Sequence, residues 1–158
     1  MKYKGIIFDL DGTILDSMPA WENIDIEFLA ENNILPPEGL ADVMKTLSFT
    51  QSAEYLVREF SLSMTVEQVM DRIREMVDEK YRHVIELKPF VPEFLQKQRE
   101  NKVKMCIATA THRELAEIAL KRLKVYDYFE FVLTCADVGK GKEEPDIYLK
   151  SAEMLGKS

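Results

Sequence analysis

The chain has 158 residues, 46% of them hydrophobic and 31% charged, which is enough apolar material for a buried core and argues against disorder. Its 21 basic and 28 acidic side chains give a formal net charge of −7. An acidic chain without a basic run is a poor candidate for nucleic-acid binding, and no apolar stretch approaches the roughly 20 residues of a membrane span. The two cysteines, Cys106 and Cys135, lie in apolar segments outside any CxxC pair. We therefore expect a cytoplasmic protein without nucleic-acid or membrane partners.

Three short apolar runs predict buried strands, because each is bounded by polar residues or chain breakers; they cover residues 5–8, 103–108 and 131–133. Helical patterns follow or separate these runs, at residues 92–100, 111–123 and 146–155. The second of these begins with a capping box from Thr111 to Glu114, and the third is expected to stop at Gly156. The alternation predicts the α/β class, with a Rossmann-like parallel sheet covered by helices.

Residues 17–86 differ, because they contain helical patterns but no convincing strand. The patterns lie at residues 21–29, at 52–60 and in a long stretch that begins with Thr65 to Gln68. We therefore expect an α/β core formed by residues 1–16 and 87–158, interrupted by an all-helical domain at 17–86.

Two carboxylates, Asp9 and Asp11, follow the first predicted strand at the edge of the sheet where parallel α/β folds bind ligands. Two like charges this close favour a cation between them, and Mg²⁺ typically takes one or two carboxylates together with phosphate oxygens. A carboxylate can also attack phosphorus to form an acyl phosphate. Taken alone, the Asp-Leu-Asp-Gly segment reads equally well as a turn after a strand.

Two further polar elements end the second and third strands. Thr109, followed by Ala110 and the start of a helix, offers a hydroxyl and backbone N–H groups to a phosphate, although Thr is also an ordinary helix cap. Lys142 lies in the loop after the third strand and can bring a positive charge to a phosphoryl group, although a single Lys is more often a surface residue. Their joint occurrence with Asp9 and Asp11 favours a phosphate site.

The chain resembles the haloacid dehalogenase-like hydrolases, in the branch of phosphoglycolate phosphatase and β-phosphoglucomutase. Phe8 to Ser17 (FDLDGTILDS) looks like the first family motif, DxDGT. The segment Ile107 to Thr111 (IATAT) resembles the second motif, and Gly141 to Tyr148 (GKEEPDIY) resembles the third, GKxxPDxY/F. The helical insertion after the first motif looks like the cap domain of that branch. The resemblance covers the whole chain, with the motifs in the family order.

The resemblance implies a Mg²⁺-dependent phosphatase that acts on a small phosphorylated metabolite through an aspartyl-phosphate. Asp9 would be the nucleophile and a metal ligand; Asp11 would be the general acid and base and would ligate the metal through its backbone carbonyl. Thr109 would hydrogen-bond the phosphoryl group and Lys142 would neutralise its charge. The phosphate-binding set that the resemblance implies comprises Leu10, Asp11, Thr109, Ala110 and Lys142.

A fourth family motif, an acidic pair on a later strand, has no counterpart in the sequence. The 158 residues are then either part of a longer chain, which we favour, or a damaged enzyme, and in both cases we expect them alone to bind Mg²⁺ weakly and to turn over slowly. Two other functions stay open, a β-phosphoglucomutase-like sugar phosphomutase and a catalytically inactive module that binds phosphorylated metabolites. The mutase is disfavoured because residues 36–52 contain no Arg to match the specificity loop of that enzyme, and the binding module because it has no need of an acid at Asp11. The substrate and the oligomeric state do not follow from the sequence.

Overall fold

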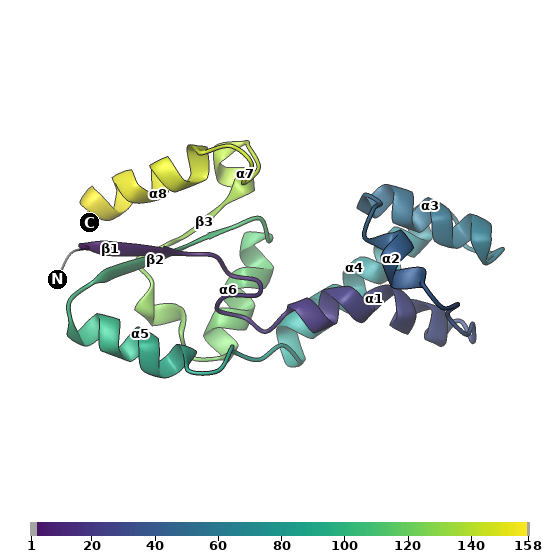
Figure 1. The fold of residues 1–158 in the computed structure, drawn as a ribbon, viewed down its shortest axis with the longest axis horizontal. Coiled ribbons are helices and arrows are strands. Elements are labelled where there is room, and N and C mark those ends of the chain that lie inside the picture. The colour runs from purple at the N-terminus through teal and green to yellow at the C-terminus, as the bar shows by residue number, and fades with distance from the viewer. Residues whose placement is uncertain (1–2, 158) are drawn as a thin grey trace. The chain divides into compact units, whose positions relative to one another are not determined.

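A computed structural model describes residues 3–157, and its chain forms two compact units (Figure 1). One unit, here called the core unit, comprises the chain up to Met18 and from Tyr81 onward. The other, the helical unit, runs from Pro19 to Lys80. The helical unit thus interrupts the core unit in sequence.

The core unit contains a three-stranded parallel sheet in the order β1-β2-β3, formed by Gly5–Phe8, Lys104–Thr109 and Val132–Thr134. Gly5 lies opposite Lys104, and Ile107 lies opposite Val132. All three predicted strands are confirmed, the second and third with a shift of one residue toward the C-terminus. Consequently Thr109 is the last residue of β2 rather than the first residue after it. The predicted α/β class with a parallel sheet is confirmed.

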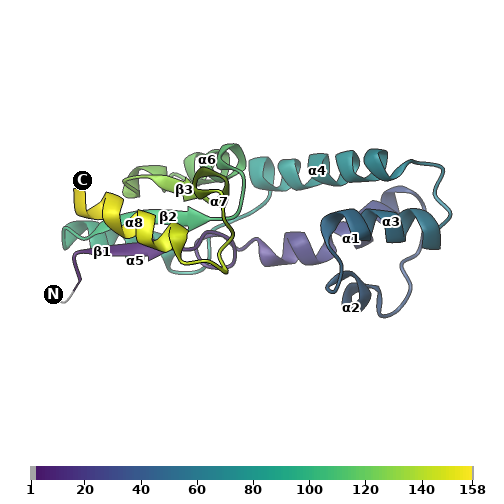
Figure 2. The ribbon, with the colours of Figure 1, turned by 90° about the horizontal axis from the view of Figure 1, so that it is seen from above.

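Helices cover both faces of this sheet. In Figures 1 and 2, α8 lies over one face, while α5 and α6 lie over the other. The short helix α7 follows β3 directly. The bounds are Val91–Glu100 for α5, Arg113–Arg122 for α6, Cys135–Val138 for α7 and Asp146–Lys157 for α8, and Tyr126–Tyr128 form a single 3₁₀ turn. Ile147 of α8 is fully buried against Ala108 of β2 and Leu133 of β3, which fixes α8 on the sheet.

Two helix ends differ from the prediction. Helix α8 does not stop at Gly156 but continues to Lys157. Leu155 is 8% exposed, and its side chain lies so close to Gly5 of β1 that a Cβ there would be 3.1 Å from it. This packing against the strand outweighs the cost of one glycine in a helix, about 1 kcal/mol. Helix α6 begins at Arg113 with His112 as its cap and without a side-chain capping bond, so the predicted capping box from Thr111 is wrong.

The helical unit contains four helices. The first residue of α1 and the last three residues of α4 are assigned to the core unit. They are α1 (Met18–Glu31), α2 (Leu40–Met44), α3 (Phe49–Glu59) and α4 (Val66–His83). Thr65 and Gln68 exchange reciprocal hydrogen bonds of 2.9 and 3.2 Å, which confirms the predicted start of α4. The sequence did not reveal α2, because its five residues are too few to show a helical period. The fully buried side chains of Phe28, Leu56 and Val69 contribute to the core of the helical unit.

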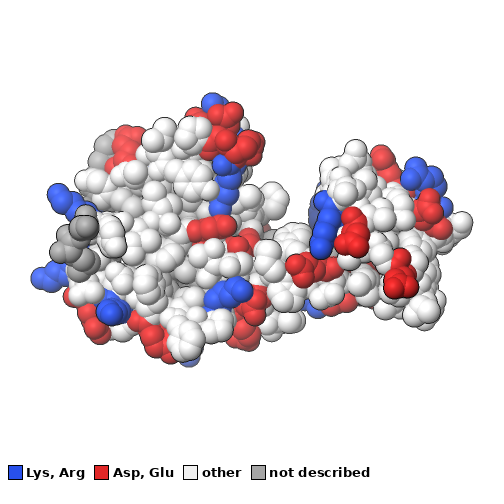
Figure 3. All heavy atoms as spheres, viewed as in Figure 1, with Lys and Arg blue, Asp and Glu red and all other residues white. Residues whose placement is uncertain are grey.

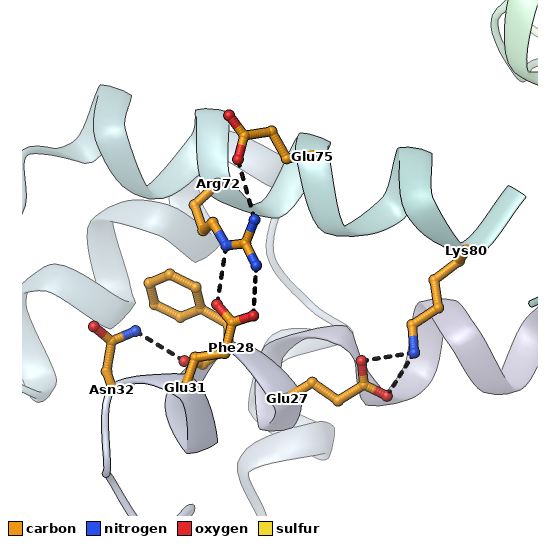
Figure 4. A network of polar contacts seen from close by, with 7 residues as sticks. All are labelled: Glu27, Phe28, Glu31, Asn32, Arg72, Glu75 and Lys80. Atoms are coloured by element: carbon orange, nitrogen blue, oxygen red, sulfur yellow. Dashed lines mark hydrogen bonds and ion pairs between the residues drawn. The ribbon is translucent and has the colours of Figure 1, made fainter. Parts of the chain in front are cut away.

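Ion pairs join α1 to α4 within the helical unit (Figure 4). The Arg72 guanidinium donates to both carboxylate oxygens of Glu31, at 2.9 and 2.6 Å, and also to Glu75 at 3.1 Å. Closer to the end of α4, Lys80 lies 2.9 Å from Glu27. The hydrogen bond from Arg72 holds the pKa of Glu31 below its ordinary value, although partial burial opposes this shift. Such a two-pronged contact is the geometry that makes an Arg–carboxylate pair effective.

Replacing Glu31 with Gln should destabilise the protein at neutral pH and have little effect in acid. A carboxyl whose folded pKa is lowered stabilises the fold above its unfolded pKa, near 4.5, and this contribution is lost as the pH falls through the folded value. Because the pair is partly exposed, we expect a difference of about 1 kcal/mol or less at pH 7. Denaturant melts of both proteins between pH 7 and pH 3 measure it. The exposed Glu54→Gln on α3 is the control; a wild-type advantage that grew in acid would contradict the expectation.

The drawn face of the molecule carries charges of both signs, and the two cysteines are not paired with each other. On the face drawn in Figure 3, acidic and basic side chains lie interspersed on both units. Within residues 3–157, no helix is both long and apolar enough to cross a bilayer. Cys106 is fully buried in β2, and burial raises the pKa of its thiol to about 11 despite a hydrogen bond with Ser151. Cys135 is half-buried at the start of α7, and both cysteines are free thiols.

Candidate active site

The loop after β1 turns tightly around the backbone carbonyl of Leu10. That oxygen accepts hydrogen bonds from the N–H groups of Thr13, Ile14 and Leu15, at 3.3, 2.9 and 3.0 Å. Gly12 has a φ of +76°, a backbone angle that residues with a side chain rarely adopt. Its N–H donates to the carbonyl of Leu15 at 2.8 Å. The side chains of Leu10 and Leu15 are fully buried. The buried leucines fix the loop, while Asp9 and Asp11 on either side of Leu10 stay accessible at the carboxyl end of β1.

Residues 86–88 of the core unit form hydrogen bonds with residues 14–16, at the end of this loop. The N–H of Asp16 donates to the carbonyl of Glu86 at 2.8 Å, and the N–H of Lys88 donates to the carbonyl of Ile14 at 2.9 Å. Leu15 and Leu87 form an antiparallel bridge between these two bonds. The chain segment that leaves the core unit is therefore paired with the segment that returns to it.

The structure brings Asp9 and Lys142 together, although 133 positions separate them in the sequence. The Lys142 ammonium lies 2.5 Å from Oδ1 of Asp9, and the N–H of Leu10 donates to the same oxygen at 2.7 Å. Lys142 comes from the loop between α7 and α8, as expected. The Asp9 side chain is 49% exposed, so an incoming molecule can reach it. A carboxylate held beside a cation at an open sheet edge is suited to meet a phosphoryl group.

Three hydroxyl groups hold the carboxylate of Asp11. Ser17 donates to Oδ1 at 2.7 Å, Tyr81 donates to the same oxygen, and Thr111 donates to Oδ2 at 2.5 Å. Ser17 is fully buried, Tyr81 is 1% exposed, and Asp11 itself is half-buried. Hydrogen bonds on both oxygens fix the orientation of the carboxylate. A group that exchanges a proton with a bound molecule requires such a fixed orientation.

Thr109 lies at the end of β2 and is 1% exposed. Its Oγ1 accepts a hydrogen bond from the N–H of Thr111 at 3.0 Å. A hydroxyl that accepts one hydrogen bond keeps its proton to donate another, so Thr109 can still donate to a phosphoryl oxygen. Ala110 is exposed between the two threonines, beside the bend that precedes α6. The second motif therefore contributes one phosphate-binding candidate, Thr109, and one Asp11 partner, Thr111.

Sequence reasoning missed Ser17, Tyr81 and Thr111 as parts of the site. Thr111 was interpreted as the cap of α6, but its hydroxyl binds Asp11, which explains the absence of a side-chain cap on that helix. Tyr81 lies in the long helical pattern that begins at Thr65, and its sequence position does not mark it as part of a site. Ser17 was part of the first motif, but its sequence position does not reveal which group its hydroxyl binds. In each case the sequence offers only a hydroxyl near the end of a predicted helix or strand. Such hydroxyls are too common for one of them to be singled out as a site residue.

Asp137, which follows β3, has a structural role rather than a catalytic one. It exchanges capping bonds with Thr134 at the start of α7, at 2.7 and 3.3 Å, and pairs with Arg113 of α6. Partial burial alone would raise the pKa of Asp137, but the hydrogen bonds from Thr134 and the nearby Arg113 hold it below its ordinary value. Arg113 also donates to the carbonyl of Val132 at 2.7 Å. These bonds fix the ends of β3 and α6 next to the site.

The donors available for a hard cation are the carboxylate of Asp9 and the backbone carbonyl of Asp11, because both carboxylate oxygens of Asp11 already accept hydrogen bonds. One carboxylate and one carbonyl at the end of one strand fit Mg²⁺, which often binds one or two protein carboxylates and completes its shell with water and phosphate oxygens. Within residues 3–157, no group of three or more Asp, Glu, His or Cys side chains is arranged to hold a metal. The donor set therefore fits a cation shared with a phosphorylated ligand better than a closed protein cage.

Known proteins are similar to this chain along nearly its whole length. Residues 6–157 match the family model of the haloacid dehalogenase-like hydrolases. "Putative pyrophosphatase PpaX" of Caldanaerobacter subterraneus is 28% identical over 98% of this chain and 69% of its own. Hexitol phosphatase A of Escherichia coli is 27% identical over 99% of this chain and 70% of its own. The crystal structure of a "putative beta-phosphoglucomutase" from Thermotoga maritima superposes with a TM-score of 0.88, at 23% identity, over 98% of this chain and 71% of its own.

Fold, site and relatives define an enzyme of the phosphoric monoester hydrolase class. Because the family model spans nearly the whole described chain, the protein belongs to the haloacid dehalogenase-like hydrolase family.

Proposed function

We propose that this protein is a Mg²⁺-dependent phosphatase that hydrolyses a small phosphorylated metabolite through a phosphorylated Asp9. The contact between the Lys142 ammonium and the Asp9 carboxylate is the observation that carries the proposal. It supports a nucleophile and a countercharge for the phosphoryl group that meet at one accessible point. The phosphatases among the relatives, such as hexitol phosphatase A, support a small phosphorylated substrate. The free thiols, one of them buried, fit a reducing cytoplasm.

In the first step, a carboxylate oxygen of Asp9 forms a bond to phosphorus while the bond from phosphorus to the ester oxygen breaks. Asp11 gives its proton to the departing oxygen, which leaves as an alcohol. In the second step, Asp11 takes a proton from a water molecule as that water attacks phosphorus. The bond to Asp9 breaks, and inorganic phosphate leaves. The three hydroxyls on Asp11 support this role, because they hold both of its oxygens in place.

The remaining residues bind and neutralise the phosphoryl group. Thr109 donates its hydroxyl to a phosphoryl oxygen, and the backbone N–H groups of Asp11 and Ala110 contribute further donors. The N–H of Leu10, which donates to Oδ1 of Asp9 in the structure, would turn to the phosphoryl group when it binds. Lys142 offsets negative charge on both the nucleophile and the phosphoryl oxygens. The Asp9 carboxylate and the Asp11 backbone carbonyl would hold Mg²⁺, which supplies additional positive charge to the phosphoryl group when bound.

We also propose that the insertion at residues 17–86 acts as a cap domain on an α/β core formed by 1–16 and 87–158. The buried side chains and the α1–α4 ion pairs of the helical unit support its behaviour as one compact piece. A cap of this kind excludes water while the phosphoryl group is transferred to Asp9, and it carries the side chains that select the substrate.

Removal of divalent metal tests the proposal. Purified protein with saturating Mg²⁺ should release phosphate slowly but measurably from members of a panel of sugar, polyol and aryl phosphates, as followed by colorimetric phosphate detection. Chelation with EDTA should lower this rate by about tenfold or more, because the phosphoryl charge loses its cation, and excess Mg²⁺ should restore it. The control is the same assay with Ca²⁺, a larger ion with more ligands, which should restore less. Release that is unaffected by chelation would refute the metal requirement, and no release from any ester would refute the phosphatase.

A further inference from the structure

Tyr81 is tied to the site through both its side chain and its backbone. Its side chain is 1% exposed, and its hydroxyl donates to Oδ1 of Asp11. A buried tyrosine hydroxyl needs an acceptor, and any backbone carbonyl would satisfy it. Here the acceptor is the carboxylate to which the proposed function assigns proton transfer. Asp11 shares this oxygen with Ser17, so two donors from different chain segments fix the same atom.

Arg122 of α6 holds the backbone of Tyr81. Its guanidinium donates to the carbonyl of Tyr81 from Nε at 3.2 Å and from a terminal nitrogen at 3.0 Å. The same terminal nitrogen reaches the carbonyl of Ile85 at 2.5 Å. Carbonyls in the last turn of a helix have no partner within that helix, and a positive charge there is favourable. The planar guanidinium therefore fixes the end of α4, and with it the base of the Tyr81 side chain.

We propose that Tyr81 is a positioning residue for Asp11, and that Arg122 supports it by fixing the end of α4. The inference rests on the proposed function, because it assumes that Asp11 protonates the leaving oxygen. With Tyr81 in place, Oδ1 of Asp11 has two donors and Oδ2 has one, so rotation of the carboxylate breaks three hydrogen bonds. Without its hydroxyl, Oδ1 keeps only the bond from Ser17, and the carboxylate samples orientations that do not face the leaving oxygen. Tyr81 itself transfers no proton.

Replacing Tyr81 with Phe tests this assignment, because Phe keeps the ring and removes the hydroxyl. The variant is assayed on an alkyl phosphate, glycerol 3-phosphate, and on an aryl phosphate, 4-nitrophenyl phosphate. An alkoxide leaves poorly without a proton, whereas a nitrophenolate leaves without one. We expect kcat/KM, which reports the steps up to phosphorylation of Asp9, to fall by about tenfold or more on the alkyl ester and by less than about threefold on the aryl ester. The second step, in which Asp11 acts as the base, is common to both esters and does not enter kcat/KM.

The decisive number is the ratio of kcat/KM on the alkyl ester to kcat/KM on the aryl ester. Both esters are assayed on one preparation, so this ratio does not depend on the fraction of the protein that is folded. Tyr128→Phe is the matched control, because its hydroxyl bonds to Gln96 at 2.9 Å and not to Asp11. Its ratio should equal that of the wild type. Arg122→Lys, which keeps the charge but loses the forked contact, should shift the ratio in the same direction as Tyr81→Phe. In an Asp11→Asn background, Tyr81→Phe should leave the ratio unchanged.

The outcomes separate this inference from the proposed function. A larger loss on the alkyl ester for Tyr81→Phe, absent in the Asp11→Asn background, supports the positioning role. Equal losses of kcat/KM on both esters, or no loss, overturn it while the phosphatase stands. Wild-type protein that hydrolyses no ester of the panel overturns the proposed function, and the inference with it.

Discussion

Replacing Asp9 with Asn should lower phosphate release by about 10⁴-fold or more, measured with an aryl phosphate and saturating Mg²⁺. The amide is a far weaker nucleophile than a carboxylate and cannot form the acyl phosphate. The change also leaves the Lys142 ammonium beside a neutral group, so the local charge balance is lost. Side-chain volume hardly changes, and the position is half exposed, so the fold should melt at a nearly unchanged temperature.

Asp16→Asn is the matched control for this experiment. Asp16 lies in the same loop, is exposed, and pairs with Lys88 at 3.6 Å, so its loss removes a carboxylate without touching Asp9. We expect its rate to stay within about twofold of the wild type, because an exposed ion pair contributes little. Beryllium fluoride with Mg²⁺, which mimics a phosphorylated carboxylate, should raise the melting temperature of wild type and Asp16→Asn but not of Asp9→Asn. Unchanged turnover in Asp9→Asn would exclude Asp9 as the nucleophile.

The parts of the fold that the sequence predicted well are those in which local pattern and burial agree. Residues 5–8 form a continuous apolar run between polar neighbours, which in a short segment is typical of a parallel strand. Thr65 and Gln68 form the helix start that their spacing indicates. Asp9 and Lys142 meet because carboxyl ends of parallel strands share one edge of the sheet, so topology alone brings their loops together.

What the sequence did not predict depends on contacts between distant segments. The pattern from Thr111 to Glu114 is a valid capping box by spacing, but the carboxylate of Asp11, 100 positions earlier, takes the hydroxyl that the cap requires. Likewise Gly156 is a reasonable helix stop, but α8 continues to Lys157, and Leu155 in this last turn packs against Gly5. In both cases a tertiary contact competes with a local preference of about 1 kcal/mol and wins.

The same reasoning explains why the partners of Asp11 were missed while Asp11 itself was found. A carboxylate two positions after another, at a strand end, is unusual and chemically costly, so the pair draws attention in a sequence. A hydroxyl is common and satisfied by many acceptors, so Tyr81 reads as core until the fold supplies its partner. The residues that orient a catalytic group are therefore harder to recognise from sequence than the group itself.

Replacing Lys142 with Met should lower kcat by about 10²- to 10³-fold, which is the usual loss when one fixed charge or donor at a reacting group is removed. Met keeps the unbranched stem but lacks the ammonium that lies beside Oδ1 of Asp9. Two negative groups, the Asp9 carboxylate and the incoming phosphoryl group, would then approach each other without this countercharge. The Lys142 side chain is 22% exposed, so solvent compensates for the lost charge only in part.

Lys140→Met is the matched control, because it removes the same charge from the same loop. Lys140 pairs with Asp146 at 3.4 Å, whereas Lys142 is the lysine that pairs with Asp9, and the Lys140 side chain is 52% exposed. A general electrostatic attraction for anionic substrates would make both variants lose similar amounts, and mainly in KM at low salt. A contact made to the reacting phosphoryl group instead lowers kcat in Lys142→Met alone, at low and at high salt. Equal effects of the two substitutions would show that Lys142 acts only as surface charge, and the site would then lack its proposed countercharge.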